Sequence, residues 1–261
     1  MKLVLIKLGG SLITDKAKPF TEDLKTIKRL ASEIHKAKEA GSLFIVGHGG
    51  GSYPHVPAVK YKTAQGIRNN ASYRGIAEVQ DAAARLNRIV VAEFIKTGEN
   101  AVSLSPSSFM LGEDAEIKKA FLSPLLKILE FKMLPVVYGD VVLDSKKGCF
   151  IASTEKILSF LALKLKAKFG IEKVIHCGKT DGVYDKQGKT IPKISTENFD
   201  KVRAEIGGSD GIDVTGGMLH KIEEALTLAK NGIPSVIING ARPGELLNAL
   251  LGKFHRGTEV I

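Results

Sequence analysis

The segment "IVGHGGGSYPHV", from Ile45 to Val56, places a histidine on either side of three consecutive glycines. Glycine lets backbone N–H groups approach an anionic ligand closely, and an imidazole can donate a hydrogen bond to a phosphate oxygen. Two further pairs, Gly9–Gly10 and Gly216–Gly217, also follow segments that resemble strands. Parallel sheets bind ligands at the carboxyl ends of their strands, where a following helix N-terminus adds partial positive charge. Three such clusters favour an anion-binding site over three unrelated tight turns.

Lysines accompany the glycines. Lys7 and Lys16 flank the first pair, and Lys221 lies one helical turn beyond the third. Phosphoryl transfer needs such point charges, because they offset the charge on the transferred group and on the leaving oxygen. Each is also compatible with an ordinary surface lysine except Lys7, because a lysine inside an apolar strand is costly without a partner. The chain lacks both G-x-x-x-x-G-K-[ST] and G-x-G-x-x-G, so neither a Walker loop nor a dinucleotide fingerprint has support.

The composition is that of a folded enzyme-sized chain. Its 261 residues are 44% hydrophobic and 25% charged, which is enough to bury a core in one large domain or two lobes. The net charge of +10 is spread along the chain, so we expect solvated helix faces and no nucleic-acid partner. No apolar run approaches ~18 residues, so no membrane span is expected. Cys149 and Cys177 fit a reducing, cytoplasmic location as buried small side chains.

Apolar runs alternate with segments of helical spacing, which predicts a mainly parallel sheet with helices on both faces. The predicted strands span 3–8, 43–47, 101–105, 134–139, 173–177 and 234–240, and the predicted helices span about 21–41, 71–97, 117–131, 154–169, 215–232 and 243–252. Thr21 is the expected cap of the first helix, and Pro243 is expected near the start of the last. The segment 139–153 predicts a hairpin that turns at Lys146–Gly148.

Several motifs together resemble a known family. "KLGGS", "HGGGS", "GDVV", "DVTGGM" with Lys221, and "GTEVI" are similar to the amino acid kinase superfamily. Within it, "HGGGSYPH", "AVSLSPSSF", "GIDVTGGMLHK" and "INGARPGELLNALLG" resemble archaeal-type isopentenyl phosphate kinases almost from end to end. The resemblance implies an open αβα sandwich, usually a homodimer, that moves the γ-phosphoryl group of ATP onto isopentenyl phosphate. It also implies an N-terminal acceptor-binding lobe, about 1–148, and a C-terminal nucleotide-binding lobe, about 149–261.

The same resemblance assigns roles to single residues. The backbone N–H groups of Gly49 and Gly50 would bracket the transferring phosphoryl group, Gly49 toward the acceptor and Gly50 toward ATP. His55 corresponds to the acceptor-phosphate histidine, and Gly139 to an acceptor-side glycine beside Asp140, which would orient the loop. The residues that would bind or neutralise the nucleotide phosphates are Lys7, Lys16 and Lys221 as charge-stabilising lysines, with Gly9, Gly10, Ser11, Asp181, Gly216 and Gly217 around them. The acceptor is already ionised, so no general base is required.

Three positions depart from the family pattern. Pro54 replaces a glycine before the histidine and removes an N–H. Glu155 takes the place of an aspartate that organises the paired lysines, and keeps its charge on a longer arm. Lys179 replaces a nucleotide-side aspartate, and either contacts phosphate or is a solvated loop lysine. His48 is expected to be a packed or backbone-bonded histidine, and no protein metal site is expected, since magnesium would come with ATP.

Two alternative functions fit parts of this pattern. One is a kinase of another small phosphate or phosphonate, because fosfomycin kinases resemble the chain in the glycine loop and histidine. The other is a nucleotide-binding sensor without catalysis. The presence of Lys7, Lys16, His55 and Lys221 together argues against the sensor, which has no need of an acceptor histidine.

Overall fold

The computed structural model describes residues 2–15, 17–39, 41–206 and 214–261, with the side chains of 214–216 left aside. Lys16 therefore lies outside the described residues. Within them, one eight-stranded sheet forms the centre, in the order β12-β14-β13-β9-β1-β2-β6-β3. Its strands are β1 (Lys2–Leu8), β2 (Leu43–His48), β3 (Ala101–Ser103), β6 (Leu134–Tyr138), β9 (Gly170–Gly178), β12 (Lys193–Ile194), β13 (Ser235–Asn239) and β14 (Thr258–Val260).

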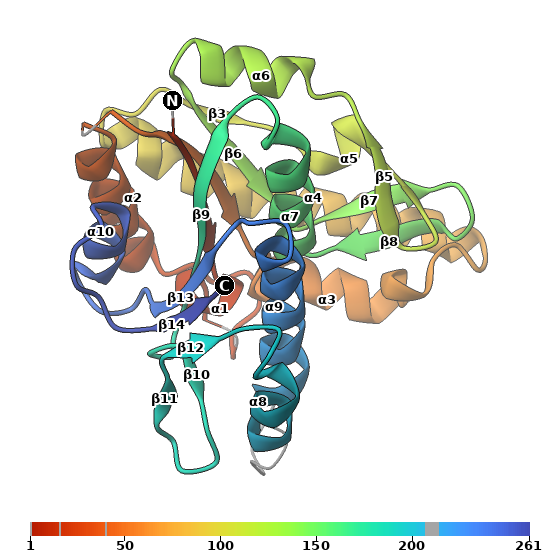
Figure 1. The fold of residues 1–261 in the computed structure, drawn as a ribbon. Helices are drawn as coiled ribbons and strands as arrows, with labels where there is room; N and C mark the ends of the chain where they lie inside the picture. The colour runs from red at the N-terminus through yellow and green to blue at the C-terminus, as the bar shows by residue number, and fades with distance from the viewer. Residues whose placement is uncertain (1, 16, 40, 207–213) are drawn as a thin grey trace.

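The sheet is mainly parallel, as the alternating pattern predicts. Every pairing in it runs parallel except that of β13 with β14. Helices cover both faces, which gives the open αβα sandwich expected from the sequence (Figure 1). These helices are α1 (Gly10–Ile13), α2 (Leu24–Lys38), α3 (Ser52–Tyr61), α4 (Asn70–Lys96), α5 (Pro106–Phe109), α6 (Ser123–Glu130), α7 (Thr154–Leu165), α8 (Phe199–Ile206), α9 (Val214–Ala229) and α10 (Glu245–Leu250).

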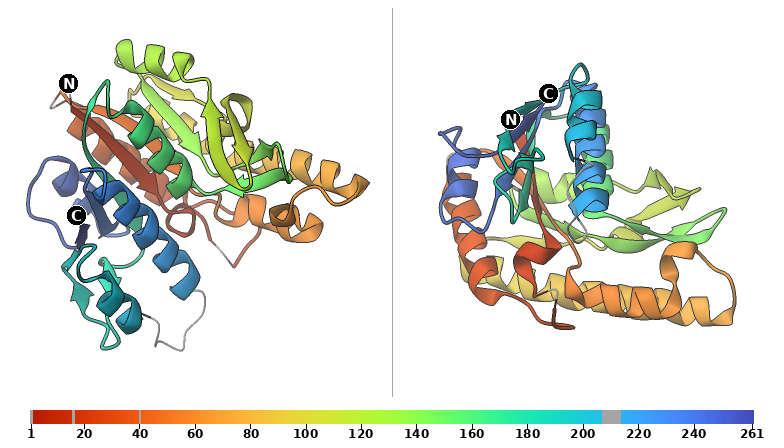
Figure 2. Two further views of the ribbon diagram at one scale, coloured as in Figure 1. Left: turned by 45° about the vertical axis from the view of Figure 1, so that its right-hand side comes forward. Right: turned by 90° about the horizontal axis from the view of Figure 1, so that it is seen from below.

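The alternation of side chains along β1 assigns each residue to one of two cores. Val4, Ile6 and Leu8 pack with α2, α4 and α10 on one face. Leu3 and Leu5 pack on the other face with α6 and α7. Since successive side chains of a strand point to opposite faces, Lys7 belongs to the α7 face. The long helix α4 runs along the first face and continues beyond it beneath the smaller sheet (Figure 2).

A four-stranded sheet lies beside the main one, in the order β5-β4-β7-β8. The predicted hairpin is present as β7 (Asp140–Asp144) and β8 (Gly148–Ala152), and it is joined by β4 (Met110–Glu113) and β5 (Glu116–Ala120). The helix predicted over 117–131 is therefore wrong in its first part. Residues 116–120 pair with β4, and the helix begins at Ser123 with a proline in its first turn. A further pair, β10 (Val183–Tyr184) and β11 (Thr190–Ile191), completes the strands.

Two predicted helix starts also need correction. The side chain of Asp23, not Thr21, caps α2, because its Oδ1 accepts from the Thr26 N–H at 2.9 Å. Pro243 precedes Gly244, the N-cap of α10, so it lies outside that helix. The main sheet is continuous across the predicted lobe boundary, and the division into two lobes stays a prediction. Among the described helices, none combines the length and apolarity needed to cross a bilayer.

Candidate active site

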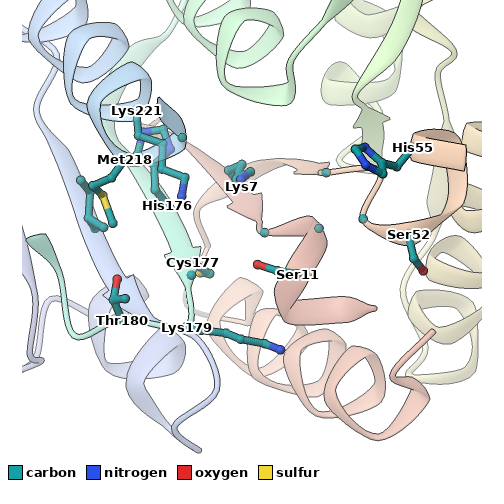
Figure 3. A pocket seen from close by; sticks show the side chains of 18 residues that line it. Lys7, Ser11, Ser52, His55, His176, Cys177, Lys179, Thr180, Met218 and Lys221 are labelled. Atoms are coloured by element: carbon teal, nitrogen blue, oxygen red, sulfur yellow. The ribbon is translucent and has the colours of Figure 1, made fainter. Parts of the chain in front are cut away.

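The order of the central strands creates the place for a site. From β1 the chain goes to β2 on one side and later to β9 on the other. Parallel sheets leave a crevice outside the carboxyl ends of their strands where the strand order reverses in this way. A cavity of about 570 Å³ lies here, lined from the ends of β1, β2, β9 and β13 and from α1, α3 and α9 (Figure 3).

Most of the predicted site residues meet in this cavity. Those that line it are Lys7, Gly9, Gly10, Ser11, Gly49, Gly50, His55, Lys179, Gly217 and Lys221. Gly139, Glu155 and Asp181 do not line it. Gly216 lies in the first turn of α9 beside Gly217, so the third glycine pair sits within a helix and not directly after a strand.

The first two glycine loops pack backbone against backbone. A Cβ atom at Gly10 would lie 2.4 Å from the Gly51 nitrogen, and one at Gly49 would lie 2.6 Å from the Gly10 nitrogen. Gly51 also adopts a φ of +56°, which side chains rarely tolerate. The hydroxyl of Thr14 ties the loops together, because it donates to the Gly10 carbonyl at 2.8 Å and accepts from the Ser52 N–H at 3.1 Å. The glycines are thus required by the contact between the loops.

Not all backbone donors of these loops are free to bind an anion. The Gly49 N–H donates to the Leu8 carbonyl at 2.9 Å, which extends the pairing of β2 with β1. This N–H is therefore bonded within the protein, and its role toward the acceptor stays a prediction. Within the described chain, the N–H groups of Gly10, Ser11, Gly50 and Gly51 have no protein acceptor, so they are available to an anion.

Lys7 has the partner that its place in an apolar strand demands. Its Nζ lies 2.7 Å from Oε1 of Glu155, the second residue of α7, and both side chains are about nine-tenths buried. Burial alone would raise the pKa of Glu155, but the charge and hydrogen bond of Lys7, with weaker help from His176 and Lys221, hold it at about 2. The ion pair therefore persists throughout the physiological pH range.

His176 was missed by the sequence analysis, which treated "KVIHC" as a plain strand. It lines the cavity from β9, next to Lys7 in the strand register. Figure 3 shows Lys7, His176 and Lys221 together on one side of the cavity, with His55 on the other. Cys177, Thr180 and Met218 also line this side. No role in the site was predicted for any of them from the sequence, although Met218 ends the "DVTGGM" motif.

The opposite side of the cavity is formed by the start of α3. His55 is exposed there and lines the cavity. Pro54 precedes it in the first helical turn, where an N–H has no intrahelical partner in any case. The proline ring packs on the glycine loop, since a Cβ at Gly50 would lie 2.2 Å from its Cγ. This proline therefore supports the loop as well as removing a donor.

His48 has a structural role, as expected. It is fully buried, with Nδ1 3.1 Å from the Gly49 carbonyl and Nε2 3.1 Å from the side-chain amide of Asn87. Its ring also stacks on Tyr138, with centroids 5.7 Å apart. Burial lowers the pKa of His48 to about 4, more than the hydrogen bond to Gly49 raises it. A neutral imidazole thus holds the base of the glycine loop.

Asp140 anchors the "SLSPSS" segment. Its carboxylate accepts from the Ser107 N–H and the Ser105 hydroxyl, each at 3.1 Å. Burial raises the pKa of Asp140, and these hydrogen bonds counteract that rise. Gly139 precedes it, and its N–H donates to the His48 carbonyl at 3.0 Å. Gly139 thus holds the backbone at His48, Asp140 holds the segment of Ser105 and Ser107, and neither residue lines the cavity.

The comparisons with known proteins agree with this geometry. The model of the Amino acid kinase family matches residues 2–239. The chain belongs to the amino acid kinase family. It is 38% identical to an isopentenyl phosphate kinase of Methanothermobacter thermautotrophicus over 99% of this chain and 98% of the relative, and 34% identical to that of Methanocaldococcus jannaschii over the same shares. A solved isopentenyl phosphate kinase superposes with a TM-score of 0.83, at 33% identity, covering 98% and 99% of the two chains.

In this amino acid kinase, the loop after β9 carries Lys179, which departs from the family pattern, and Asp181, which matches it. Lys179 lines the cavity. Burial would raise the pKa of Asp23, but hydrogen bonds from Thr26 hold that pKa below its ordinary value, and the charge of Lys179 adds to the lowering. Asp181 turns away from the cavity lining. It accepts from the Asn239 amide at 2.8 Å and pairs with Arg242 at 2.5 Å. Asp181 therefore fixes the loop that carries Lys179.

The described residues contain no group of three or more His, Cys, Asp and Glu side chains arranged to hold a metal ion. Glu155 lies near the cavity, but its carboxylate is engaged by Lys7 at 2.7 Å. The described cavity lining carries three lysines and no carboxylate, which suits a polyanion and does not suit a protein-held magnesium ion.

Proposed function

We propose that this chain is a kinase that transfers the γ-phosphoryl group of ATP to isopentenyl phosphate, giving isopentenyl diphosphate and ADP in isoprenoid biosynthesis. The observation that carries the proposal is a single cavity in which the cationic groups Lys7 and Lys221 face the imidazole of His55 across two glycine loops. The names of the similar proteins give the acceptor.

ATP is assigned to the side of Lys7 and Lys221. Their ammonium groups offset the charge of the phosphate chain, and the ion pair with Glu155 holds Lys7 in place. The N–H groups of Gly10 and Ser11, at the first turn of α1, donate to phosphate oxygens. Lys179 extends the same positive surface, and Lys16 and Gly217 belong to it by family pattern.

The acceptor phosphate is assigned to the side of His55. Its imidazole donates to the monophosphate, while the N–H of Gly50, between the two sides, donates to the transferring group. The acceptor oxygen is already ionised near neutral pH, so the site needs alignment and charge neutralisation and no general base. Transfer is then in line, from the nucleotide to the acceptor, across the loops.

Three further properties belong to the proposal. Magnesium would arrive with the nucleotide, bound by its phosphates, because the described side chains offer no cage for it. The active form is a homodimer, and the location is cytoplasmic. Gel filtration with light scattering tests the dimer.

A panel of acceptors tests the function. Purified protein with ATP and Mg²⁺ is offered isopentenyl phosphate, dimethylallyl phosphate, fosfomycin and glutamate, and ADP formation is followed together with the phosphorylated product. We expect the isoprenoid phosphates to be preferred. Preference for fosfomycin would assign a phosphonate kinase instead, and nucleotide binding without any transfer would assign a sensor.

A further inference from the structure

The side chain of His176 has an unmet need for a hydrogen bond. It is 2% exposed, and neither ring nitrogen has a partner among the residues that the structure describes. Elsewhere in the described part of the chain, the buried side-chain atoms without a partner are the hydroxyl oxygens of Thr63, Ser159 and Ser235, and none of these residues lines the cavity. Because an unpaired buried polar group destabilises a fold, an imidazole kept in this state calls for a ligand.

The sheet register places this imidazole among the charged groups of the site. His176 is the register partner of Lys7 on β1 and of Ile237 on β13. Its neighbours Ile175 and Cys177 belong to the core on the α2 side, so His176 points to the α7 and α9 side, as Lys7 does. The charged groups that face it are Lys7 from β1, Glu155 from α7 and Lys221 from α9, while β13 brings only Ile237.

These surroundings determine what the imidazole can do. Burial lowers the pKa of His176 to about 4; Glu155 opposes this, and Lys7 and Lys221 add to it. The ring is therefore neutral near pH 7, with one N–H donor and one lone pair. Lys7 and Lys221 attract a polyanion into the cavity beside this ring, and phosphate oxygens are acceptors only. A ring N–H facing them can complete its hydrogen bond.

We propose that His176 donates a ring N–H to the phosphate chain of the bound nucleotide, beside Lys7 and Lys221. The inference rests on the proposed function only in taking that cavity side as the nucleotide's. The ring N–H of His176 is a neutral hydrogen-bond donor with a fixed direction. It would bind phosphate oxygens beside the lysines without adding positive charge. The residue is a binding group that the fold keeps buried and unpaired until the nucleotide arrives.

Binding of ADP to three proteins tests the proposal by calorimetry: wild type, His176→Leu and His176→Gln. Leu has a similar volume and no donor, so ADP should bind about tenfold more weakly, the scale of a hydrogen bond to a charged group. Gln keeps an N–H and should recover most of the affinity. Affinity for isopentenyl phosphate should stay within about twofold in both variants. ADP affinity of His176→Leu equal to that of wild type would overturn the proposal.

Thermal unfolding without nucleotide separates binding from a packing role. Leu removes an unpaired polar group, so the melting temperature of His176→Leu should equal or exceed that of wild type, while its rise on adding ADP should shrink. A lower melting temperature in the absence of ADP, with the rise on adding ADP unchanged, would overturn the proposal in favour of packing. Should wild type bind ADP without phosphorylating isopentenyl phosphate, the proposed function fails and these comparisons still decide the role of His176.

Nitrogen NMR of the histidine rings gives a direct readout. The His176 ring signals, identified by their loss in His176→Leu, should shift when ADP is added to wild type. The His48 ring is the internal reference, because both its nitrogens are bonded within the protein and should not change. Unchanged His176 signals at saturating ADP would contradict the hydrogen bond.

Discussion

The two sides of the cavity use histidine and charge in opposite ways. On the side assigned to the nucleotide, two of the proposed binding groups are buried: Lys7 of β1 pairs with Glu155 of α7, and His176 is unpaired among the described residues. On the acceptor side the tasks are divided. His48 is buried and bonded through both nitrogens, whereas His55 is exposed and lines the cavity.

On the acceptor side, one histidine therefore serves stability and another serves binding. On the nucleotide side, the same buried groups serve both. His48 and His176 lie on strands next to β1, are similarly buried, and both have a pKa lowered by burial to about 4. They differ in their hydrogen bonds and in the charged groups beside His176. We therefore expect substitutions on the nucleotide side to change both folding and chemistry, and substitutions on the acceptor side to change one or the other.

The largest effect is expected for Lys7→Met. It leaves the Glu155 carboxylate buried without its cation, so the free energy of unfolding should fall by ~3–5 kcal/mol, and the pKa of Glu155 should rise. Chemical denaturation measures the loss. The double variant Lys7→Met with Glu155→Gln is the control: it should regain much of the stability and none of the activity. A loss below ~1 kcal/mol in the single variant would show that the pair is not integral to the fold.

Lowering the pH should destabilise the folded protein through its two buried histidines, His48 and His176. Each has a folded pKa of about 4 against an ordinary 6.5, so the unfolded chain binds more protons between these values. The free energy of unfolding should therefore fall as pH drops, by about 2 kcal/mol for each histidine between pH 7 and pH 5. Urea unfolding at pH 7, 6 and 5 measures the slope.

The His176→Leu variant serves as the comparison for this slope. Between pH 7 and pH 5, the free energy of unfolding of this variant should fall only by the amount that His48 contributes. That fall is about half the one expected for wild type. Asp140, whose pKa is raised by burial, acts in the opposite direction but is present in both proteins. Parallel curves for the two proteins would mean that His176 is accessible to protons in the folded state.

The sequence predicted much of this arrangement, and the failures have physical causes. The cost of a lysine in an apolar strand predicts that Lys7 has a partner, without structural information. The first two glycine clusters also lie at strand ends as predicted. The helix predicted over 117–131 failed because pairing with β4 overrides local propensity in residues 116–120, and Pro124 marked the true helix start.

The pairing of strands that are far apart in the chain explains why some site residues could not be predicted from the sequence. His176 becomes a site residue only through its pairing with Lys7, nearly 170 positions earlier in the chain. No local pattern in "KVIHC" encodes that partner. The same holds for the Gly49 N–H, whose acceptor Leu8 belongs to another strand. Chemistry that depends on residue type was predictable, and chemistry that depends on register was not.

His55→Ala tests the division of tasks on the acceptor side. Loss of a positioned donor should remove at least ~2 kcal/mol of transition-state stabilisation, seen in kcat/KM for the acceptor. Because His55 is exposed, the free energy of unfolding should change by less than ~0.5 kcal/mol. An unchanged rate would remove His55 from the mechanism. A marked loss of stability would instead place it with the buried groups of the nucleotide side.

The smallest effect is expected for Thr14, whose hydroxyl supports the glycine loops between the two sides. Thr14→Val removes the hydroxyl that joins the two glycine loops and leaves the Ser52 N–H unpaired, which should cost ~1 kcal/mol of stability. Thr14→Ser keeps the hydroxyl and is the matched control. Since the proposed function places both substrates against these loops, Thr14→Val should lower kcat with similar changes in both KM values. An effect on the KM of one substrate alone would mean that the loops belong to that side only, because a shared support cannot shift without moving both phosphates.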